Sequence, residues 1–204
     1  MINTIIFDFG DVFINLDKHG AMQNALDLFE LSMFEEDMLI TNMAYETGHI
    51  TTQQFIDFYC SKFPKLNEDQ VVHAWNFILK DFPKYRLEFI QNLAQQREYQ
   101  LILLSNTNEM HIDYIRSSDI EFYTDFKTCF DRFYLSHEIQ LRKPNADIFE
   151  FVLQTDNLDP NHCLFIDDTK ENTDAAENLG IHVWNIDETK EDIINLFDLK
   201  KHLF

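Results

Sequence analysis

The stretch IIFDFGDVF at residues 5–13 decides the fold. It overlaps an apolar run, Thr4–Phe9, whose β-branched and aromatic residues predict a buried strand. Asp8 lies near the end of this run and is followed by Gly10 and Asp11. A carboxylate at the end of a buried strand can attack phosphorus, bind a metal ion or cap a turn. Asp8 is therefore the first candidate for chemistry.

The same alternation of apolar runs and helical stretches continues along the chain. Further strands are predicted at Gln100–Leu104, Arg132–Leu135, Cys163–Ile166 and His182–Asn185. Apolar residues at three- and four-residue spacing predict helices at Tyr85–Arg97, Ala146–Gln154, Asn172–Leu179 and Asp192–Phe197. Strands separated by helices of this length predict an α/β fold, a Rossmann-like parallel sheet flanked by helices. Ligands bind such sheets beyond the carboxyl ends of the strands.

Residues 17–82 have a different pattern. They are rich in Phe, Met, Leu, Glu and Gln and show no convincing strand, so several amphipathic helices are expected. Gly48 and Pro64 mark breaks, and Thr51 is a candidate N-cap for a helix over Thr52–Cys60. An insertion this long after the first strand exceeds a simple crossover. We therefore predict a core domain of residues 1–16 and 83–204 and a helical cap domain of residues 17–82.

Charge and composition narrow the classes of partner. The 204 residues hold 16 Lys and Arg against 36 Asp and Glu, a formal charge of −20. Such a field repels nucleic acids and anionic membranes, so neither is an expected partner. No apolar run suits a signal peptide or a membrane span, and the three cysteines show no CxxC spacing, which together favour a cytoplasmic protein with reduced thiols. Composition leaves the oligomeric state open.

Polar residues follow several of the predicted strands. Ser105 and Asn106 follow the second, and Asp167 with Asp168 follow the fourth. Lys143 precedes Pro144 at the predicted start of a helix. Each has an ordinary alternative, as a turn residue, a helix cap or a surface lysine. Adjacent carboxylates repel each other unless a cation offsets them, and Mg²⁺ prefers oxygen ligands, so Asp8 and Asp167 fit a shared magnesium site.

Taken in order, these residues form a set that resembles the haloacid dehalogenase-like (HAD) hydrolases, and within them the helical-cap phosphatases that include glucose-1-phosphate phosphatases. The resemblance covers nearly the whole chain. It rests on IIFDFGDVF, LLSNTN at 103–108, LSHEIQLRKPNADIFEFVL at 135–153, LFIDDTKENTDAAENLG at 164–180 and, in the cap, YETGHITTQQF at 45–55.

The resemblance implies a Mg²⁺-dependent phosphatase of a small phosphorylated metabolite, such as a sugar phosphate, that works through a phospho-aspartate. Asp8 is then the nucleophile and a metal ligand, and Lys143 the cation that steadies the nucleophile and the phosphoryl group. Ser105 and Asn106 bind the phosphoryl group. The remaining metal ligands are the Gly10 carbonyl and Asp167, with Asp168 in a supporting role.

Gly10 departs from the more common family pattern. Many members carry an Asp two residues after the nucleophile, which serves as general acid and then base. Gly10 has no side chain for this task. Asp11, the nearest carboxylate, is offset by one residue; a turn residue is its expected role, and a supporting role in the site is the alternative. General acid–base help is worth roughly 10²–10⁴-fold, so poor leaving groups should react most slowly.

Two other functions are compatible with parts of this pattern. A 2-haloacid dehalogenase shares the fold and the Asp nucleophile but has no use for the metal-binding acidic pair. Gly10 leaves open a second alternative, a non-catalytic module that binds a phosphorylated ligand or a protein partner. In the cap, Glu46, His49 and Trp75 are candidate substrate contacts, although helix packing is the more common role of such residues.

Overall fold

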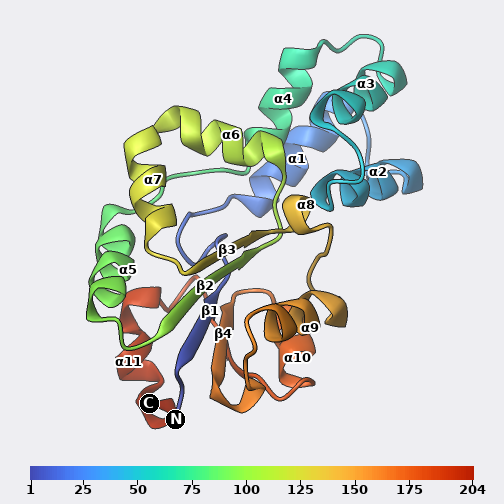
Figure 1. Ribbon diagram of the computed structural model, residues 1–204. Helices are drawn as coiled ribbons and strands as arrows, with labels where there is room; N and C mark the ends of the chain where they lie inside the picture. Colours follow the sequence, from blue (N-terminus) through green and yellow to red (C-terminus); the bar gives the residue numbers. More distant parts are fainter.

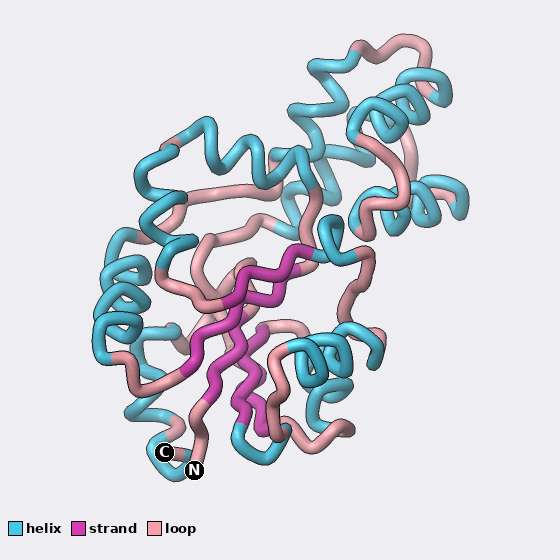
Figure 2. Tube along the Cα trace, in the orientation of Figure 1, coloured by secondary structure: helices cyan, strands magenta, loops and turns pink.

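A computed structural model describes residues 1–204, apart from the side chain of Ile120. A central sheet is flanked by helices on both faces, and a separate group of helices lies above one end of it (Figure 1). Figure 2 shows the strands as the middle layer, with helices on either side. In this described part of the chain, none of the helices combines the length and apolar composition that crossing a bilayer requires.

The sheet confirms the predicted α/β fold. Its five strands are all parallel and lie in the order β3-β2-β1-β4-β5. Their bounds are β1 Thr4–Phe7, β2 Gln100–Ser105, β3 Arg132–Leu135, β4 Cys163–Asp167 and β5 His182–Asn185. Because β1 is central, the residue that follows it has β2 on one side and β4 on the other.

Both faces of the sheet are buried, which is why its central strands are apolar throughout. In β1, Ile5 and Phe7 belong to one apolar cluster, whereas Ile6 belongs to the other, as the alternation of a strand requires. Helices on the first face are α5 Lys84–Gln96, α6 Glu109–Ser118, α7 Ile120–Thr128 and α11 Leu196–Leu199. Those on the second are α9 Ala146–Thr155 and α10 Lys170–Glu177.

Four helices form between residues 17 and 82, as the sequence predicts. They are α1 Lys18–Phe29, α2 Glu36–Glu46, α3 Thr52–Lys62 and α4 Glu68–Asn76. Thr51 caps α3, and its hydroxyl and the side chain of Gln54 form the reciprocal bonds of a capping box. These helices share an apolar cluster that is separate from the two clusters on the sheet. We use "cap" for residues 17–82; the domain boundaries themselves remain a prediction.

The two chain segments that connect the cap to the core pair with each other. Leu16 and Leu79 form an antiparallel bridge, and Asn15 and Asp17 donate backbone hydrogen bonds of 2.9 Å to Asp81 and Ile78. The cap therefore leaves and rejoins the core at one point, beside the loop that follows β1.

Several predicted helices differ from the observed ones at their ends. The helix predicted from Asn172 begins two residues earlier, at Lys170, and the last predicted helix is a 3-10 turn, Ile193–Asn195, followed by α11. Gly180 has φ +84°, and the amides of Gly180 and Ile181 bond back to α10, so Gly180 ends this helix as expected. The short helix α8, Ser136–Ile139, and helices α6 and α7 had no predicted counterpart.

Candidate active site

The sequence-predicted polar residues meet at the carboxyl edge of the sheet. Asp8 directly follows β1, and its backbone amide bonds to the Ile166 carbonyl of β4 at 2.9 Å. Asp167 ends β4 and Ser105 ends β2. Lys143 comes from the loop between α8 and α9, beyond β3. Parallel strands that all end at one edge thus bring together residues up to 159 positions apart.

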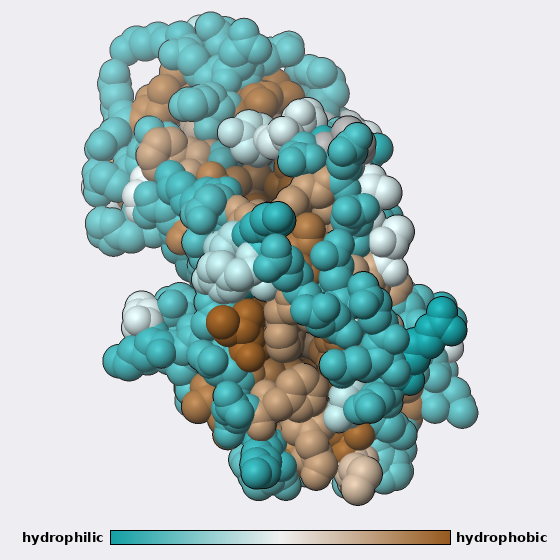
Figure 3. All heavy atoms as spheres, turned by 90° about the vertical axis from the view of Figure 1, so that its left-hand side faces the viewer, coloured by the Kyte–Doolittle hydropathy of each residue, from teal (hydrophilic) through white to brown (hydrophobic). Residues whose placement is uncertain are grey.

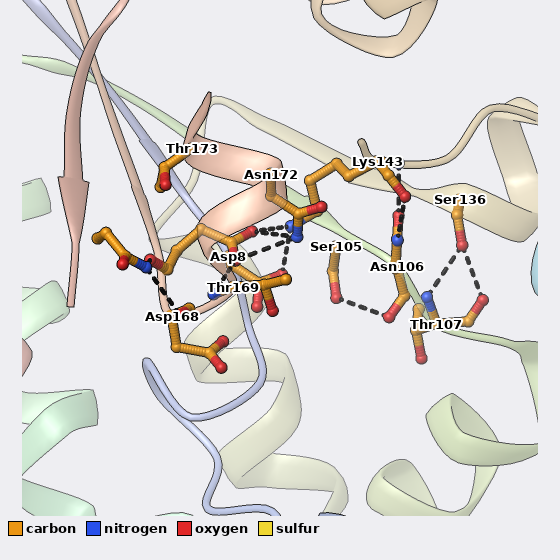
Figure 4. A network of polar contacts seen from close by, with 12 residues as sticks. Asp8, Ser105, Asn106, Thr107, Ser136, Lys143, Asp168, Thr169, Asn172 and Thr173 are labelled. Carbon is orange, nitrogen blue, oxygen red and sulfur yellow. Dashed lines mark hydrogen bonds and ion pairs between the residues drawn. The ribbon is translucent and has the colours of Figure 1, made fainter. Parts of the chain in front are cut away.

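Lys143 holds the centre of this site. Its ammonium Nζ donates to Asp8 Oδ1 and to Asp167 Oδ2, at 2.6 Å each. All three residues are buried, with Lys143 1% and Asp167 0% exposed. In Figure 4, Asp168 lies on one side of Asp8, and Ser105 and Asn106 lie on the other. A buried cation between two buried carboxylates leaves the group with an excess negative charge.

Burial decides how these groups ionise. Loss of water raises the pKa of Asp8 to about 7; the Lys143 ammonium opposes this effect, and the Asp167 and Asp168 carboxylates add to it. Burial also raises the pKa of Asp168, against the opposing effect of Lys18. Burial by itself lowers the pKa of Lys143, but Asp167 and Asp8 outweigh it and the pKa lies above its ordinary value. The ammonium therefore stays charged.

A divalent cation fits this arrangement. Asp8, Asp167 and Asp168 each offer a carboxylate oxygen, and these atoms lie within 4.8 Å of one another. Burial is the main cause of the raised pKa of Asp8, and repulsion from Asp167 and Asp168 adds to it, so Lys143 offsets only part of the negative charge. Oxygen ligands of this type suit Mg²⁺, which usually takes one or two carboxylates and completes its shell with water and phosphate.

Ser105 and Asn106 lie next to the Lys143 loop. The Asn106 side chain bonds to both backbone groups of Lys143, donating to its carbonyl at 2.8 Å and accepting from its amide at 2.9 Å. Asn106 thus positions Lys143. The Ser105 hydroxyl lies 3.5 Å from the Asn106 carbonyl oxygen. This distance is too long for a firm hydrogen bond, so the hydroxyl is available to an anion.

Asp11 is a turn carboxylate, as the sequence analysis expects. It has φ +54°, and its Oδ1 accepts from the Leu16 amide at 2.8 Å, closing the loop after β1. Its other oxygen lies 2.9 Å from Lys18 Nζ. Gly10 lines the same polar cavity as Asp8, and a Cβ at this position would lie 2.6 Å from Leu16 Cδ1. Asp11 is therefore held by Leu16 and Lys18, and it does not replace the acid–base side chain that Gly10 lacks.

Three contributors to the site were not predicted. Asn172 Nδ2 lies 3.1 and 3.0 Å from the two oxygens of Asp167, and the Thr169 amide donates to Asp167 Oδ1 at 2.8 Å. Lys18, at the start of α1, pairs with Asp168 and Asp11. A signal for Lys18 was present, because it is the sole Lys or Arg among the first 61 residues.

The three candidate cap residues fall into two groups. Glu46 ends α2 and its Oε1 accepts from Arg142 Nε, one residue before Lys143, at 2.9 Å. Glu46 and Trp75 line a cavity between the cap and the core, whereas the exposed His49 bonds to Thr47 at 2.7 Å and is not part of that lining. The structure thus brings Glu46 and Trp75, but not His49, towards the site.

The chain is similar to known proteins over most of its length. A family model for hydrolases, haloacid dehalogenase-like hydrolase, matches residues 2–180. A D-ribitol-5-phosphate phosphatase from Bacteroides thetaiotaomicron is 26% identical over 90% of this chain and 91% of its own. The solved HAD family enzyme BT-2542 from the same organism, described with magnesium and inorganic phosphate, is 30% identical with a TM-score of 0.80, covering 97% of this chain and 100% of its own.

A solved L-2-haloacid dehalogenase shows the same fold at lower identity. It is 14% identical, with a TM-score of 0.61 over 98% of this chain and 99% of its own, so this likeness bears on the fold alone. The family model covers most of the chain, and the motifs that it spans include each strand-end residue described above. The chain belongs to the haloacid dehalogenase-like hydrolases.

Proposed function

We propose that this hydrolase is a Mg²⁺-dependent phosphatase that cleaves small phosphate monoesters through a phosphorylated Asp8. The observation that carries the proposal is the convergence of Asp8, Asp167 and Lys143 at the sheet edge, with one ammonium 2.6 Å from both carboxylates. The D-ribitol-5-phosphate phosphatase relative supports this reaction class and makes sugar and sugar-alcohol phosphates reasonable first substrates.

The proposed reaction uses few side chains. Lys143, the Ser105 hydroxyl and the Asn106 region hold the phosphoryl oxygens, while an Asp8 oxygen attacks phosphorus in line with the ester oxygen. The P–O bond to the alcohol breaks, and water then cleaves the acyl phosphate to release inorganic phosphate and regenerate Asp8. In the absence of a side chain at Gly10, the departing alkoxide takes its proton from water.

The metal would be held by Asp8, Asp167, the Gly10 carbonyl and phosphate oxygens, with Asp168 in support. A bound Mg²⁺ supplies positive charge that lets an anionic nucleophile approach a dianionic phosphate. Asn172 and the Thr169 amide keep Asp167 oriented, since both bond to its carboxylate. The Asn172 side chain and the Thr169 amide therefore fix the position of the Asp167 carboxylate before any metal binds.

Substitution of the nucleophile tests the proposal. Asp8→Asn should reduce turnover of a panel of sugar phosphates, sugar-alcohol phosphates and aryl phosphates to background, because the amide cannot form the acyl phosphate. Asp69→Asn, an exposed change of the same kind in α4, serves as the matched control and should behave as wild type. Full activity in Asp8→Asn would end the proposal.

Two measurements separate the other functions. A 2-haloacid dehalogenase would release halide without added metal, whereas the proposed phosphatase requires Mg²⁺ and loses activity on chelation. Wild-type protein that cleaves no ester of the panel, yet binds phosphate with Mg²⁺, would favour a phospho-ligand binding module. Binding of beryllium fluoride with Mg²⁺, lost in Asp8→Asn, would further support the phospho-aspartate.

A further inference from the structure

A second cavity adjoins the catalytic site. It has a volume of about 400 Å³ and lies between the cap and the core. Four residues line both this cavity and the polar one that contains Asp8 and Lys143: Gly10, Leu16, Lys18 and Asn106. A phosphate held at Asp8 therefore points its ester group towards this space, so the cavity is where a leaving group would lie.

Most side chains around this cavity are apolar. Representative ones are Leu16 and Leu79 from the paired connecting segments, Met22 from α1, Phe34, and Trp75 from α4. Figure 3 shows brown, apolar surface in the hollow between the hydrophilic exteriors of the upper lobe and the rest of the molecule. Each methylene of a ligand that is buried against such a lining should raise the ligand's affinity roughly fourfold.

Most polar side chains of the lining already bond to other groups of the protein, such as Lys18 to Asp168 and Asn106 to Lys143. Asn108 Oδ1 accepts from the His111 amide at 3.0 Å, and Asn108 Nδ2 lies 3.2 Å from His111 Nδ1. His111 Nε2 lies 3.1 Å from the Trp75 carbonyl oxygen. With Asn108 donating to Nδ1, His111 donates from Nε2, so both ring nitrogens are occupied. These side chains hold the cap on the core and leave little hydrogen bonding for a ligand.

The remaining hydrogen-bonding groups are those of Asn42 and Glu46, on one face of α2, and the hydroxyls of Ser105 and Thr107. Asn42 Oδ1 accepts from the Tyr59 hydroxyl at 2.5 Å, and Glu46 Oε1 accepts from Arg142. Asn42 therefore keeps both N–H donors of its amide for a ligand, and Glu46 keeps one carboxylate oxygen. The leaving group of D-ribitol-5-phosphate carries four hydroxyls, and a hydroxyl buried without a partner loses roughly fivefold or more in affinity.

We propose that this cavity selects phosphate monoesters with a predominantly apolar leaving group over sugar-alcohol phosphates. This inference rests on the proposed phosphatase function and names its substrate class. The proposed substrates differ from the D-ribitol-5-phosphate named for the relative in lacking hydroxyls on the leaving group, so the two kinds of ester can be compared directly.

A five-carbon pair provides the central test. Pentyl phosphate and D-ribitol-5-phosphate both leave as primary alkoxides of equal chain length and differ by four hydroxyls. The neighbouring hydroxyl makes the ribitol alkoxide the better leaving group, which works against the proposal. We nevertheless expect kcat/KM to be about tenfold or more higher for pentyl phosphate. A higher kcat/KM for D-ribitol-5-phosphate would overturn the inference.

A homologous series and a matched set of variants locate the effect. From ethyl to hexyl phosphate, kcat/KM should rise roughly two- to fourfold for each methylene. Met22→Gln puts an amide of similar size into the lining and should flatten this rise, whereas Met22→Leu should keep it. Met33→Gln makes the same change at a cap residue that is 70% exposed and outside the lining, and should leave the rise unchanged. A rise that is flat in the wild type contradicts the proposal.

Binding of alkylphosphonates separates this inference from the proposed function, because phosphonates are not hydrolysed. With Mg²⁺ present, their affinity, measured by calorimetry, should increase with chain length and lose this dependence in Met22→Gln. Chain-length dependence without turnover of any ester would refute the phosphatase function and retain the apolar cavity. Turnover that requires Asp8, with phosphonate affinity independent of chain length, would refute the cavity's role alone.

Discussion

A single buried lysine supplies the positive charge between the two central carboxylates of the site. Lys143 is 1% exposed and lies 2.6 Å from two carboxylates, so its removal leaves Asp8 and Asp167 facing each other without a counter-charge. A charge that is already in place when the transition state forms needs no rearrangement, which is why such groups have large effects on rate.

We expect Lys143→Met to lower kcat by about 10²-fold or more, since the variant keeps the unbranched apolar stem of the side chain and loses the ammonium. Steady-state kinetics on the best substrate of the panel measures the change. Lys170→Met is the control, because Lys170 is an exposed lysine in α10 that pairs with Asp174. Equal kcat values for the two variants would contradict the role of Lys143.

His111 makes the stability of the protein depend on pH. Burial lowers the pKa of His111 to about 4, against the opposing effect of the hydrogen bond to the Trp75 carbonyl. An unfolded histidine titrates near 6.5, so below this pH the unfolded state binds the additional proton and the folded state loses stability until pH reaches about 4.

The free energy of unfolding, compared between wild type and His111→Gln, should reveal this titration. The difference between them should be constant above about pH 6.5 and should shift against the wild type as pH falls towards 4. Denaturant unfolding at a series of pH values measures both proteins, and carboxylate titrations that they share cancel in the difference. A difference that does not vary with pH would show that His111 does not resist protonation.

Among the elements, α8 joins the cap to the core through one hydroxyl. Ser136 Oγ accepts from the Thr107 amide at 2.9 Å and lies 2.6 Å from the Glu46 carbonyl oxygen and 2.8 Å from that of Thr107. The Ser136 hydroxyl has one proton, so it donates to only one of these two carbonyl oxygens at a time. Next to this contact, Gly48 has φ +66°, and a Cβ there would lie 2.0 Å from the His137 carbonyl oxygen, so α2 and α8 meet closely.

Ser136→Ala should destabilise the protein by about 1–3 kcal/mol, because it leaves the buried Thr107 amide without an acceptor. Thermal or denaturant unfolding measures the loss. Ser118→Ala removes an exposed hydroxyl that bonds to the Tyr114 carbonyl, and should change stability by no more than about 0.5 kcal/mol. Equal decreases in the free energy of unfolding of the two variants would mean that the Ser136 hydroxyl stabilises the protein no more than an exposed hydroxyl does.

At the scale of elements, the sequence predicts the sheet better than it predicts the helices around it. Strand runs such as Cys163–Ile166 are buried on both faces and are therefore apolar throughout, which gives a clear local signal. Helices α6 and α7 are ten and nine residues long and have side-chain caps at Asn108 and Asp119. Among their described side chains, each helix buries two apolar ones: Met110 and Ile112 in α6, Tyr123 and Phe126 in α7. Two buried residues are too few to produce a recognisable helical spacing of apolar residues in the sequence.

For the candidate site, strand-end position indicates which residues meet but not how they are supported. Asp8, Asp167 and Lys143 could be predicted because each follows a strand or belongs to a motif. Lys18 and Asn172 could not, since their contacts with Asp168 and Asp167 depend on how α1 and α10 pack. Local sequence patterns contain no such information.

For the whole molecule, charge is the dominant property. A net charge of −20 repels a phosphate dianion as it approaches and attracts a divalent cation. Because salt screens both interactions, higher ionic strength should favour binding of the phosphate and weaken binding of the divalent cation.

We expect kcat/KM for a phosphate monoester at saturating Mg²⁺ to rise about two- to threefold between 10 and 150 mM KCl, while the affinity for Mg²⁺ falls. Initial rates and calorimetric titration of Mg²⁺ measure the two effects, and a change to another monovalent salt controls for specific ions. A kcat/KM that falls with salt would mean that local positive charge at Lys143 and Lys18 outweighs the overall field.

The close approach of Leu16 to Gly10 bears on how this active site can evolve. A carboxylate introduced at residue 10, as in relatives that carry an acid there, would push Leu16 aside, and Leu16 also forms part of the floor of the apolar cavity. Because the atom in the way is the terminal methyl of a flexible side chain, Leu16 can give way, and its movement would change the wall of the cavity. Mutations at residue 10 should therefore alter substrate preference together with proton transfer.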